Sequence, residues 1–284
     1  MNEIEGEKFQ TWITPKRRLL EFDFSEIWRY RDLILLFVRR TFVAQYKQTI
    51  LGPAWAVIQP LFTTVIFTVV FGNLAGLAPQ GVPTFVFYMS GSVLWNYFSG
   101  CLTGTSTTFT ANSAILGKVY FPRLVMPIST VISNMISFAI QFCFFLVFFV
   151  YYLVIGNSIH PNGLVLLTPL LLLHLAMLSL GVGIIISALT TKYRDLVMLI
   201  SFGVQLWMYA TPIAYDMAII PEKYLSLYML NPATPIINIF RYAYLGVGQP
   251  YWGHYGVSII VTAVVLMLGI ILFNRVEKTF MDTV

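Results

Sequence analysis

Side chains that could do acid–base, metal or nucleophilic chemistry are few in this chain of 284 residues, and they follow no catalytic spacing. The sequence has no Gly-x-x-x-x-Gly-Lys-Ser/Thr loop for nucleotide phosphates, no His-Glu-x-x-His, no cysteine pair at metal-ligand spacing and no Gly-x-Ser-x-Gly nucleophile elbow. The two cysteines, Cys101 and Cys143, lie in apolar runs and do not suggest a disulfide framework. We therefore expect no catalytic residue, no metal site and no nucleotide site in this chain.

Ionisable side chains avoid the apolar runs. All 12 Asp and Glu residues lie in flanks and loops, whereas a proton- or ion-coupled transporter needs such groups in its pathway. His174 is the exception, and a single histidine there favours a hydrogen-bonded helix contact over a proton relay. If the chain transports a solute, another subunit must supply the energy.

One apolar run carries small polar residues at a regular spacing. Ser92, Asn96, Ser99, Thr103, Ser106 and Thr110 recur at alternating steps of four and three, which is one stripe of a helix. Such a stripe marks close helix packing, the safer interpretation for any single residue, or lines a polar path. Nearby rings could present apolar faces to sugar C–H groups. The candidate substrate pathway comprises Ser92, Trp95, Asn96, Tyr97, Ser99 and Thr103.

The composition is that of a membrane protein. Hydrophobic residues make up 58% of the chain and charged residues 10%, against about 25% charged in a soluble domain. This excludes a water-soluble enzyme and a disordered chain. The net charge of +5 does not indicate nucleic-acid binding, because nine of the 17 Lys and Arg residues precede residue 48, which is typical of a topogenic signal.

Six apolar runs are long enough to cross about 30 Å of hydrocarbon, so we predict an all-α integral membrane protein with six transmembrane helices. They cover roughly 53–75, 84–108, 124–155, 164–189, 196–213 and 255–273. The third is so long that it must tilt or protrude. With both termini cytoplasmic, only Lys223 and Arg241 of the Lys and Arg residues lie outside. Residues 1–24 form a cytoplasmic flank without a cleavable signal peptide, and 281–284 a cytoplasmic tail.

Two segments are predicted not to span. Residues 32–47 form an amphipathic helix in which Asp32, Arg39, Arg40 and Lys47 fall within an arc of about 100°. We expect it in the inner interface with its basic side toward lipid phosphates; a cytosolic helix packed on a partner is the alternative. Residues 214–250 are apolar but interrupted by four prolines, which predicts short external re-entrant helices, or else an external loop with amphipathic helices on the lipid.

The cytoplasmic loop 111–123 is a candidate docking element for a soluble partner. It combines Lys118 and Arg123 with Tyr120, Phe121 and Pro122, which we expect to be exposed. The alternative is an ordinary basic loop that obeys charge topology.

Three stretches, in this order, resemble the permease subunit of type-2 ATP-binding-cassette exporters, in the branch that exports polysaccharides. They are YKQTILGPAWAVIQP (46–60), KVYFPRLVMPIS (118–129) and NPATPIINIFRYA (231–243). The resemblance extends over roughly residues 25–280 and identifies them as one transmembrane domain. It implies a homodimer in the bacterial inner membrane with two ATPase subunits, which bind ATP and Mg²⁺.

The resemblance also implies site residues. Residues 25–47 correspond to the interface helix, and Leu51, Gly52 and Pro53 to a bend near which a lipid-linked substrate is taken up, beside the basic Arg39, Arg40 and Lys47. Residues 112–123 would dock into the ATPase, and 216–250 would form external gate helices that contain Asn231, Pro232, Pro235 and Arg241. Gly52-Pro53 also suits a sharp bend before a helix on its own terms.

The function that we expect is export of a lipid-linked glycan, such as an O-antigen, a capsule or a teichoic acid, with membrane lipids and no nucleic acid as further partners. A small-molecule or drug exporter of the same superfamily is the main alternative. A membrane transferase acting on a lipid-linked sugar is a second, and its external candidates are Asp216, Glu222 and His254, which have no motif spacing.

Overall fold

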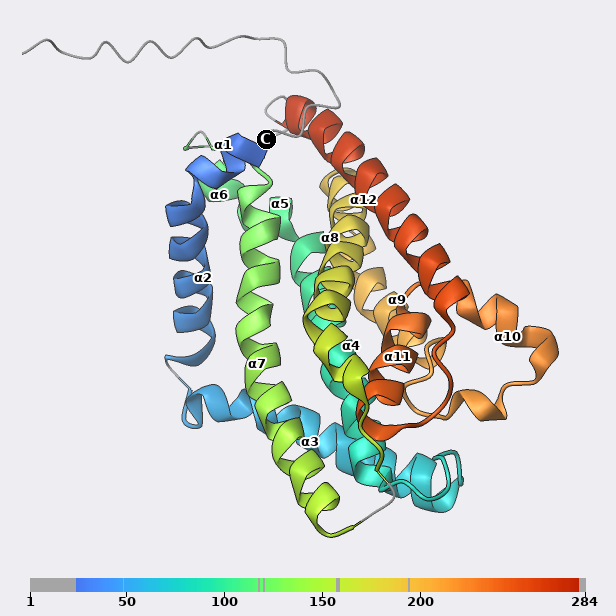
Figure 1. Cartoon of the computed structure of the whole chain (residues 1–284). Helices are drawn as coiled ribbons and strands as arrows, with labels where there is room; N and C mark the ends of the chain where they lie inside the picture. The colour runs from blue at the N-terminus through green and yellow to red at the C-terminus, as the bar shows by residue number, and fades with distance from the viewer. Residues whose placement is uncertain are drawn as a thin grey trace, which may run out of the picture.

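The computed structural model describes residues 24–280, apart from 48, 117, 120, 157, 158 and 194. The predicted flank and tail, and Tyr120, therefore lie outside the described residues. Every regular element that the structure describes is helical (Figure 1), as expected where lipid offers the backbone no hydrogen-bond partners. The first helix and the C-terminal end of the last lie at the same end of the bundle (Figure 1).

The helices follow the predicted apolar runs closely. They are α1 (Phe24–Arg29), α2 (Arg31–Tyr46), η1 (Gly52–Ala54), α3 (Trp55–Phe67), the π-helix η2 (Thr68–Leu74), α4 (Thr84–Ser106), α5 (Thr108–Ala111), α6 (Ser113–Leu116), α7 (Val125–Val154), η3 (Gly163–Leu167), α8 (Thr168–Lys192), α9 (Leu196–Tyr209), η4 (Met217–Ile219), α10 (Glu222–Met229), α11 (Ala233–Leu245) and α12 (Trp252–Phe280).

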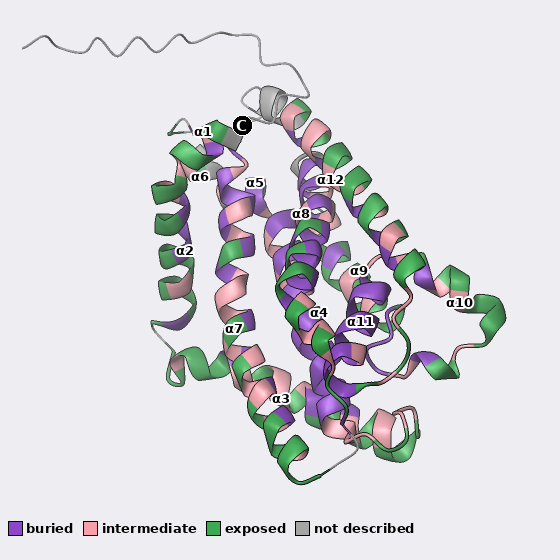
Figure 2. Ribbon diagram, in the orientation of Figure 1, coloured by how far each residue is buried: buried purple, intermediate pink, exposed green. Residues whose placement is uncertain are grey.

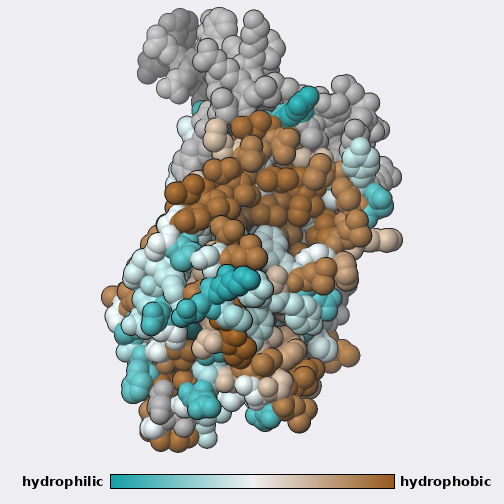
Figure 3. All heavy atoms as spheres, turned by 90° about the vertical axis from the view of Figure 1, so that its right-hand side faces the viewer, coloured by the Kyte–Doolittle hydropathy of each residue, from teal (hydrophilic) through white to brown (hydrophobic). Residues whose placement is uncertain are grey.

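Among the described residues, four helical stretches are long and apolar enough to cross a membrane. They are Gly52–Leu74, Val125–Val154, Gly163–Thr190 and Trp252–Arg275, and each matches a predicted span. The side of the molecule on which α12 lies carries a broad hydrophobic surface (Figure 3). On α12, Ile260, Val264 and Leu268 are exposed apolar side chains. These residues are solvated by lipid if α12 spans.

The other two predicted spans differ from these four. Helix α4 has 23 residues, but most of its side chains are buried inside the chain rather than turned outward (Figure 2). Helix α9 has 14 residues, which is about 21 Å of helix and less than the about 30 Å of hydrocarbon. It ends at Tyr209, four residues before the predicted end at 213.

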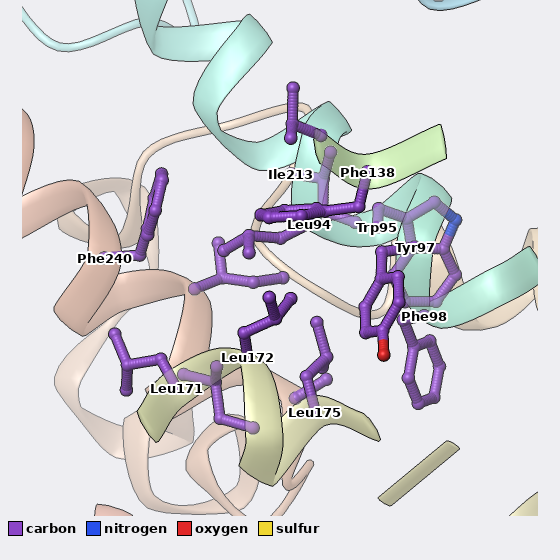
Figure 4. Packing of buried hydrophobic residues seen from close by; sticks show 14 of the residues in the cluster. Leu94, Trp95, Tyr97, Phe98, Phe138, Leu171, Leu172, Leu175, Ile213 and Phe240 are labelled. Atoms are coloured by element: carbon purple, nitrogen blue, oxygen red, sulfur yellow. The ribbon is translucent and has the colours of Figure 1, made fainter. Parts of the chain in front are cut away.

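The core forms where α4 packs between α7 and α8. Leu94, Trp95 and Phe98 of α4 share one buried cluster with Leu171, Leu172 and Leu175 of α8 and Phe138 of α7 (Figure 4). Glycines allow the close approach: a Cβ on Gly183 would lie 2.7 Å from the Cβ of Thr105. Of the predicted polar stripe, Asn96 contacts the Gln141 side chain of α7, and Thr110 lies beyond α4, in α5.

A second cluster joins α2 to the first half of α7. Ile34, Phe37 and Val38 of α2 are buried in it, and the Phe37 ring lies 5.8 Å from that of Phe121. The hydroxyls of Tyr46 and Ser137 hydrogen-bond at 3.1 Å. Helix α2 thus runs beside α7 (Figure 1). A helix that lies in the membrane interface would run across the spans, whereas α2 runs alongside α7. Its location in the inner interface therefore stays a prediction.

Candidate functional site

An open groove of about 410 Å³ separates α2 from α7, and we call it the α2–α7 groove. It is lined by Phe37, Arg40, Thr41, Ala44, Gln45, Asn112, Met126, Ser129 and Thr130. The hydroxyls of Ser129 and Thr130 already donate to the Met126 carbonyl at 2.7 and 3.1 Å, so neither is left to donate to an anion. The Arg40 guanidinium is therefore the charged donor that the groove offers to an anionic head.

The predicted uptake residues lie at this groove or along the chain after it. Arg39, Arg40 and Lys47 are all exposed, and of the three only Arg40 lines the groove. The predicted bend is present, because Gly52 has φ +50°, a left-handed conformation that favours glycine. Pro53 follows in the first turn of η1, and Leu51 and Pro53 are exposed.

The predicted docking loop is only partly exposed, which corrects our expectation. Lys118 and Val119 are exposed, but Phe121, Pro122 and Arg123 are buried. The reason is physical: the apolar face of α2 needs a cover, and Phe121 fills that place against Phe37. The part of this loop that a soluble partner could touch is therefore the tip around Lys118.

The candidate pathway residues on α4 are mostly enclosed by the chain itself. Ser92, Trp95 and Tyr97 are buried, whereas Asn96, Ser99 and Thr103 are half-buried. Tyr97 packs edge-on against Phe138, and Asn96 donates to the Gln141 side chain of α7 at 3.2 Å. These contacts hold α4 and α7 together.

The predicted external segment divides into two unlike helices. Helix α10 lies on the surface, with Tyr224 and Leu227 exposed. Helix α11 is buried on nearly every side, and its Phe240 and Tyr244 pack on Phe145 in the middle of α7. Because that part of α7 belongs to a candidate span, α11 fits the re-entrant interpretation better than a helix lying on lipid.

Arg241 is the most heavily bonded side chain of α11. Its Nη2 donates to the Ile213 carbonyl at 2.8 Å and to the Phe87 carbonyl at 3.5 Å, Nη1 donates to the Pro212 and Tyr215 carbonyls, and Nε donates to Ser90 Oγ at 3.4 Å. Its Cζ lies 3.8 Å from the centroid of the Phe87 ring. We call these residues the Arg241 cluster.

Asn231 organises the connection between α10 and α11. Its Oδ1 accepts from Trp207 Nε1 at 3.0 Å, and its Nδ2 donates to Thr211 Oγ1 at 2.8 Å. Pro232 caps α11 and accepts a hydrogen bond from Ser258 at its carbonyl, while Pro235 is buried in the first turn. The four predicted gate residues thus anchor the buried half of the segment.

His174 is the helix contact that the sequence favours. Its Nε2 lies 2.9 Å from Thr262 Oγ1 and 3.4 Å from Ser258 Oγ, and so links α8 to α12. The transferase candidates are not brought together by any contact in the structure: Asp216 accepts from the Ala218 amide, and Glu222 starts α10 on the surface. Within the described residues, His, Cys, Asp and Glu form no group of three that could hold a metal.

Gly91 packs against Arg241, and the sequence analysis did not single it out. A Cβ at this position would lie 2.6 Å from Arg241 Nη2 and 3.3 Å from Ile213 Cγ2. The available signal was a glycine in the middle of a helix, which costs about 1 kcal/mol relative to alanine and so calls for a packing reason.

Known proteins resemble the chain along most of its length. It is 27% identical to an O-antigen export system permease protein RfbA of Klebsiella pneumoniae over 253 residues, which is 88% of this chain and 94% of that protein. It is 26% identical to a protein of the same name from Myxococcus xanthus over 219 residues, which is 76% of this chain and 81% of that protein. The model of the ABC-2 type transporter family matches residues 32–245. From the fold and this match, we conclude that the chain is a multi-pass membrane protein of the ABC-2 type transporter family.

Proposed function

We propose that the chain is the permease subunit that carries a lipid-linked polysaccharide of the O-antigen type across the bacterial inner membrane. One observation carries the proposal: the similarity to proteins named O-antigen export system permease extends over 88% of the chain and 94% of the relative. The energy comes from ATP, which a separate ABC ATPase binds with Mg²⁺ and hydrolyses. The chain belongs to the ABC-2 family, and this membership supports the partnership.

Two copies, each with six crossings and both termini in the cytoplasm, form the conduit in this proposal. Four candidate spans, the long α4 and the short α9 continued by the 210–216 turn supply the crossings. Met198, Phe202 and Leu206 on α9 are exposed apolar side chains. Because Trp95 and Tyr97 are enclosed, the route runs along the α9 face between the copies.

The α2–α7 groove is the uptake site for the carrier phosphate. Arg40 supplies a charge-assisted donor at its wall, and the polar groups of Thr41, Gln45 and Asn112 line the same cavity. Phe37 and Met126 are buried against the protein, so the exposed Ala44 is the apolar lining residue that a lipid chain can reach. One ATPase subunit docks at the 112–119 loop of each copy, where Lys118 is exposed, so that two ATPase subunits bind in total.

Surface glycan tests the export function. The chain is expressed with its cognate ATPase in cells that make the lipid-linked glycan but lack its exporter, and the glycan is detected on intact cells by antibody. We expect surface glycan only when both proteins are present. Efflux of small dyes without surface glycan would show a small-molecule exporter, and glycan modification by the purified chain alone would show a transferase.

Two adjacent arginines test the uptake site. Arg40→Gln removes the cation that lines the groove, whereas Arg39→Gln removes an equally exposed cation that does not line it. We expect Arg40→Gln to reduce surface glycan several-fold and Arg39→Gln to leave it near the wild-type level. Equal losses of surface glycan in both variants would mean that the basic side of α2 attracts anionic lipid in general and that the groove is not the uptake site.

A further inference from the structure

Arg241 is a cation that the protein has fully enclosed. Its side chain is 3% exposed, and all three guanidinium nitrogens donate to protein acceptors. Four of the acceptors are main-chain carbonyls and the fifth is the Ser90 hydroxyl. No carboxylate of the described residues lies within ion-pair distance of it, so the carbonyls, the Phe87 ring and the more distant Asp216 carboxylate balance the cation.

Because all three guanidinium nitrogens donate to the protein, Arg241 has no nitrogen left to donate to a substrate. A buried guanidinium is stable only when its donors are satisfied by fixed acceptors, since desolvating a charge is expensive. Nε and Nη2 donate to α4, and Nη1 and Nη2 donate to the turn at 212–215. The residue is therefore a fastening between segments and not a ligand for the glycan.

The fastening joins three segments that are far apart in the sequence. Phe87 and Ser90 belong to α4, Arg241 belongs to α11, and the carbonyls of 212–215 belong to the turn that follows α9. The next residue in that turn extends the unit further, because the Asp216 amide donates to the Leu77 carbonyl at 3.0 Å. Leu77 follows the end of the first candidate span.

Gly91 makes room for the fastening. The 2.6 Å between Arg241 Nη2 and a Cβ built on Gly91 is closer than real contacts allow, and Ile213 closes the other side at 3.3 Å. An alanine at 91 therefore displaces the guanidinium, the turn, or both. The cluster can thus be disturbed without changing the charge of Arg241.

We propose that Arg241 is a positioning residue that holds the outer end of α9 and helix α11 against α4, and thereby keeps the permease sealed when it carries no substrate. This inference rests on the proposed function, because α9 is the proposed wall of the route. The turn at 212–215 directly continues α9, so its attachment to α4 fixes where that wall ends. The outer ends of α4, α9 and α11 move as one body while the cluster is intact.

Two variants and a matched control test the proposal in the complete transporter. Gly91→Ala crowds the guanidinium, and Arg241→Lys keeps the charge but replaces the planar fork by three donors on a flexible stem. Gly256→Ala is the control, since a Cβ on this helical glycine of α12 meets nothing within 4 Å. Three quantities are measured: membrane level with ATPase co-purification, surface glycan, and the rate at which resting cells without a galactoside permease take up a small chromogenic galactoside.

We expect Gly91→Ala and Arg241→Lys to raise galactoside uptake several-fold at unchanged membrane level and ATPase co-purification, while Gly256→Ala matches the wild type. Uptake and glycan export that stay at the wild-type level in both variants overturn the proposal. Loss of both variants from the membrane also overturns it, because the cluster is then needed for folding and not for the seal. A wild type that exports no glycan is a different result, since it refutes the proposed function itself.

Discussion

Arg40 and Arg241 present the same guanidinium in opposite settings. Arg40 is exposed on α2 and lines an open groove of about 410 Å³. Arg241 is buried, and its nitrogens already donate to carbonyls and a hydroxyl. The first can attract an anionic ligand, whereas the second can only hold protein segments together. The comparison teaches that the role of a cation in a membrane protein depends on whether its donors are already used.

Replacement of the two arginines by methionine gives the largest contrast in stability. Arg241→Met leaves the carbonyls of Pro212 and Ile213 without donors, at about 1–3 kcal/mol each, and so lowers the free energy of unfolding by about 3–5 kcal/mol. Arg40→Met changes it little, because an exposed side chain returns to solvent contact. Chemical unfolding of the purified chain in detergent micelles measures both. Similar losses of unfolding free energy in the two variants would contradict the different roles assigned to Arg40 and Arg241.

Asn231 tests whether the buried network extends beyond Arg241. Asn231→Ala removes the acceptor of Trp207 and the donor to Thr211, and we expect a loss of about 2 kcal/mol in the free energy of unfolding. Asn73→Ala, at an exposed position, serves as the control and should behave as the wild type. If the two asparagine variants unfold alike, the α10–α11 connection contributes nothing to the anchoring of α11.

Phe121 tests how much its packing against the apolar face of α2 stabilises the fold. Phe121→Leu keeps a buried apolar side chain but loses the ring contact with Phe37, and should lower the free energy of unfolding by about 1 kcal/mol. Lys118→Ala, in the exposed tip of the same loop, should leave stability unchanged and reduce ATPase co-purification instead. Reversed results would show that Phe121 contacts the ATPase and that Lys118 supports the fold.

Helix positions were predictable from the sequence because length and apolarity fix them. The predicted run 124–155 and helix α7 (Val125–Val154) differ by one residue at each end. Apolarity does not tell which neighbour covers a helix, since a lipid-facing and a core-facing Leu look alike. For this reason the sequence left packing and a pathway both open for α4, and the enclosure of Trp95 and Tyr97 is visible only in the structure.

Local composition also failed where tertiary contacts decide exposure. Phe121 lies in a loop with Lys118 and Arg123, which suggested an exposed docking element, yet the apolar face of α2 needs that ring. Arg241 was placed among the gate residues by resemblance, but its carbonyl partners lie about 30 and 150 residues away in the sequence. No local pattern encodes a contact at such separations.

Salt gives the smallest and most specific test of the comparison between the two arginines. Raising the ionic strength from 0.1 to 1 M shortens the Debye length from about 10 Å to about 3 Å. We expect the wild type to retain more phosphatidylglycerol than Arg40→Gln after purification at low salt, and this difference to vanish at 1 M, because Arg40 is exposed.

The stability difference between the wild type and Arg241→Lys should be the same at both salt concentrations, since solvent ions do not reach a side chain that is 3% exposed. A lipid difference that survives 1 M salt would mean that the groove binds its ligand through directed hydrogen bonds, as the Arg241 cluster binds its carbonyls, and the two settings would then differ in access alone.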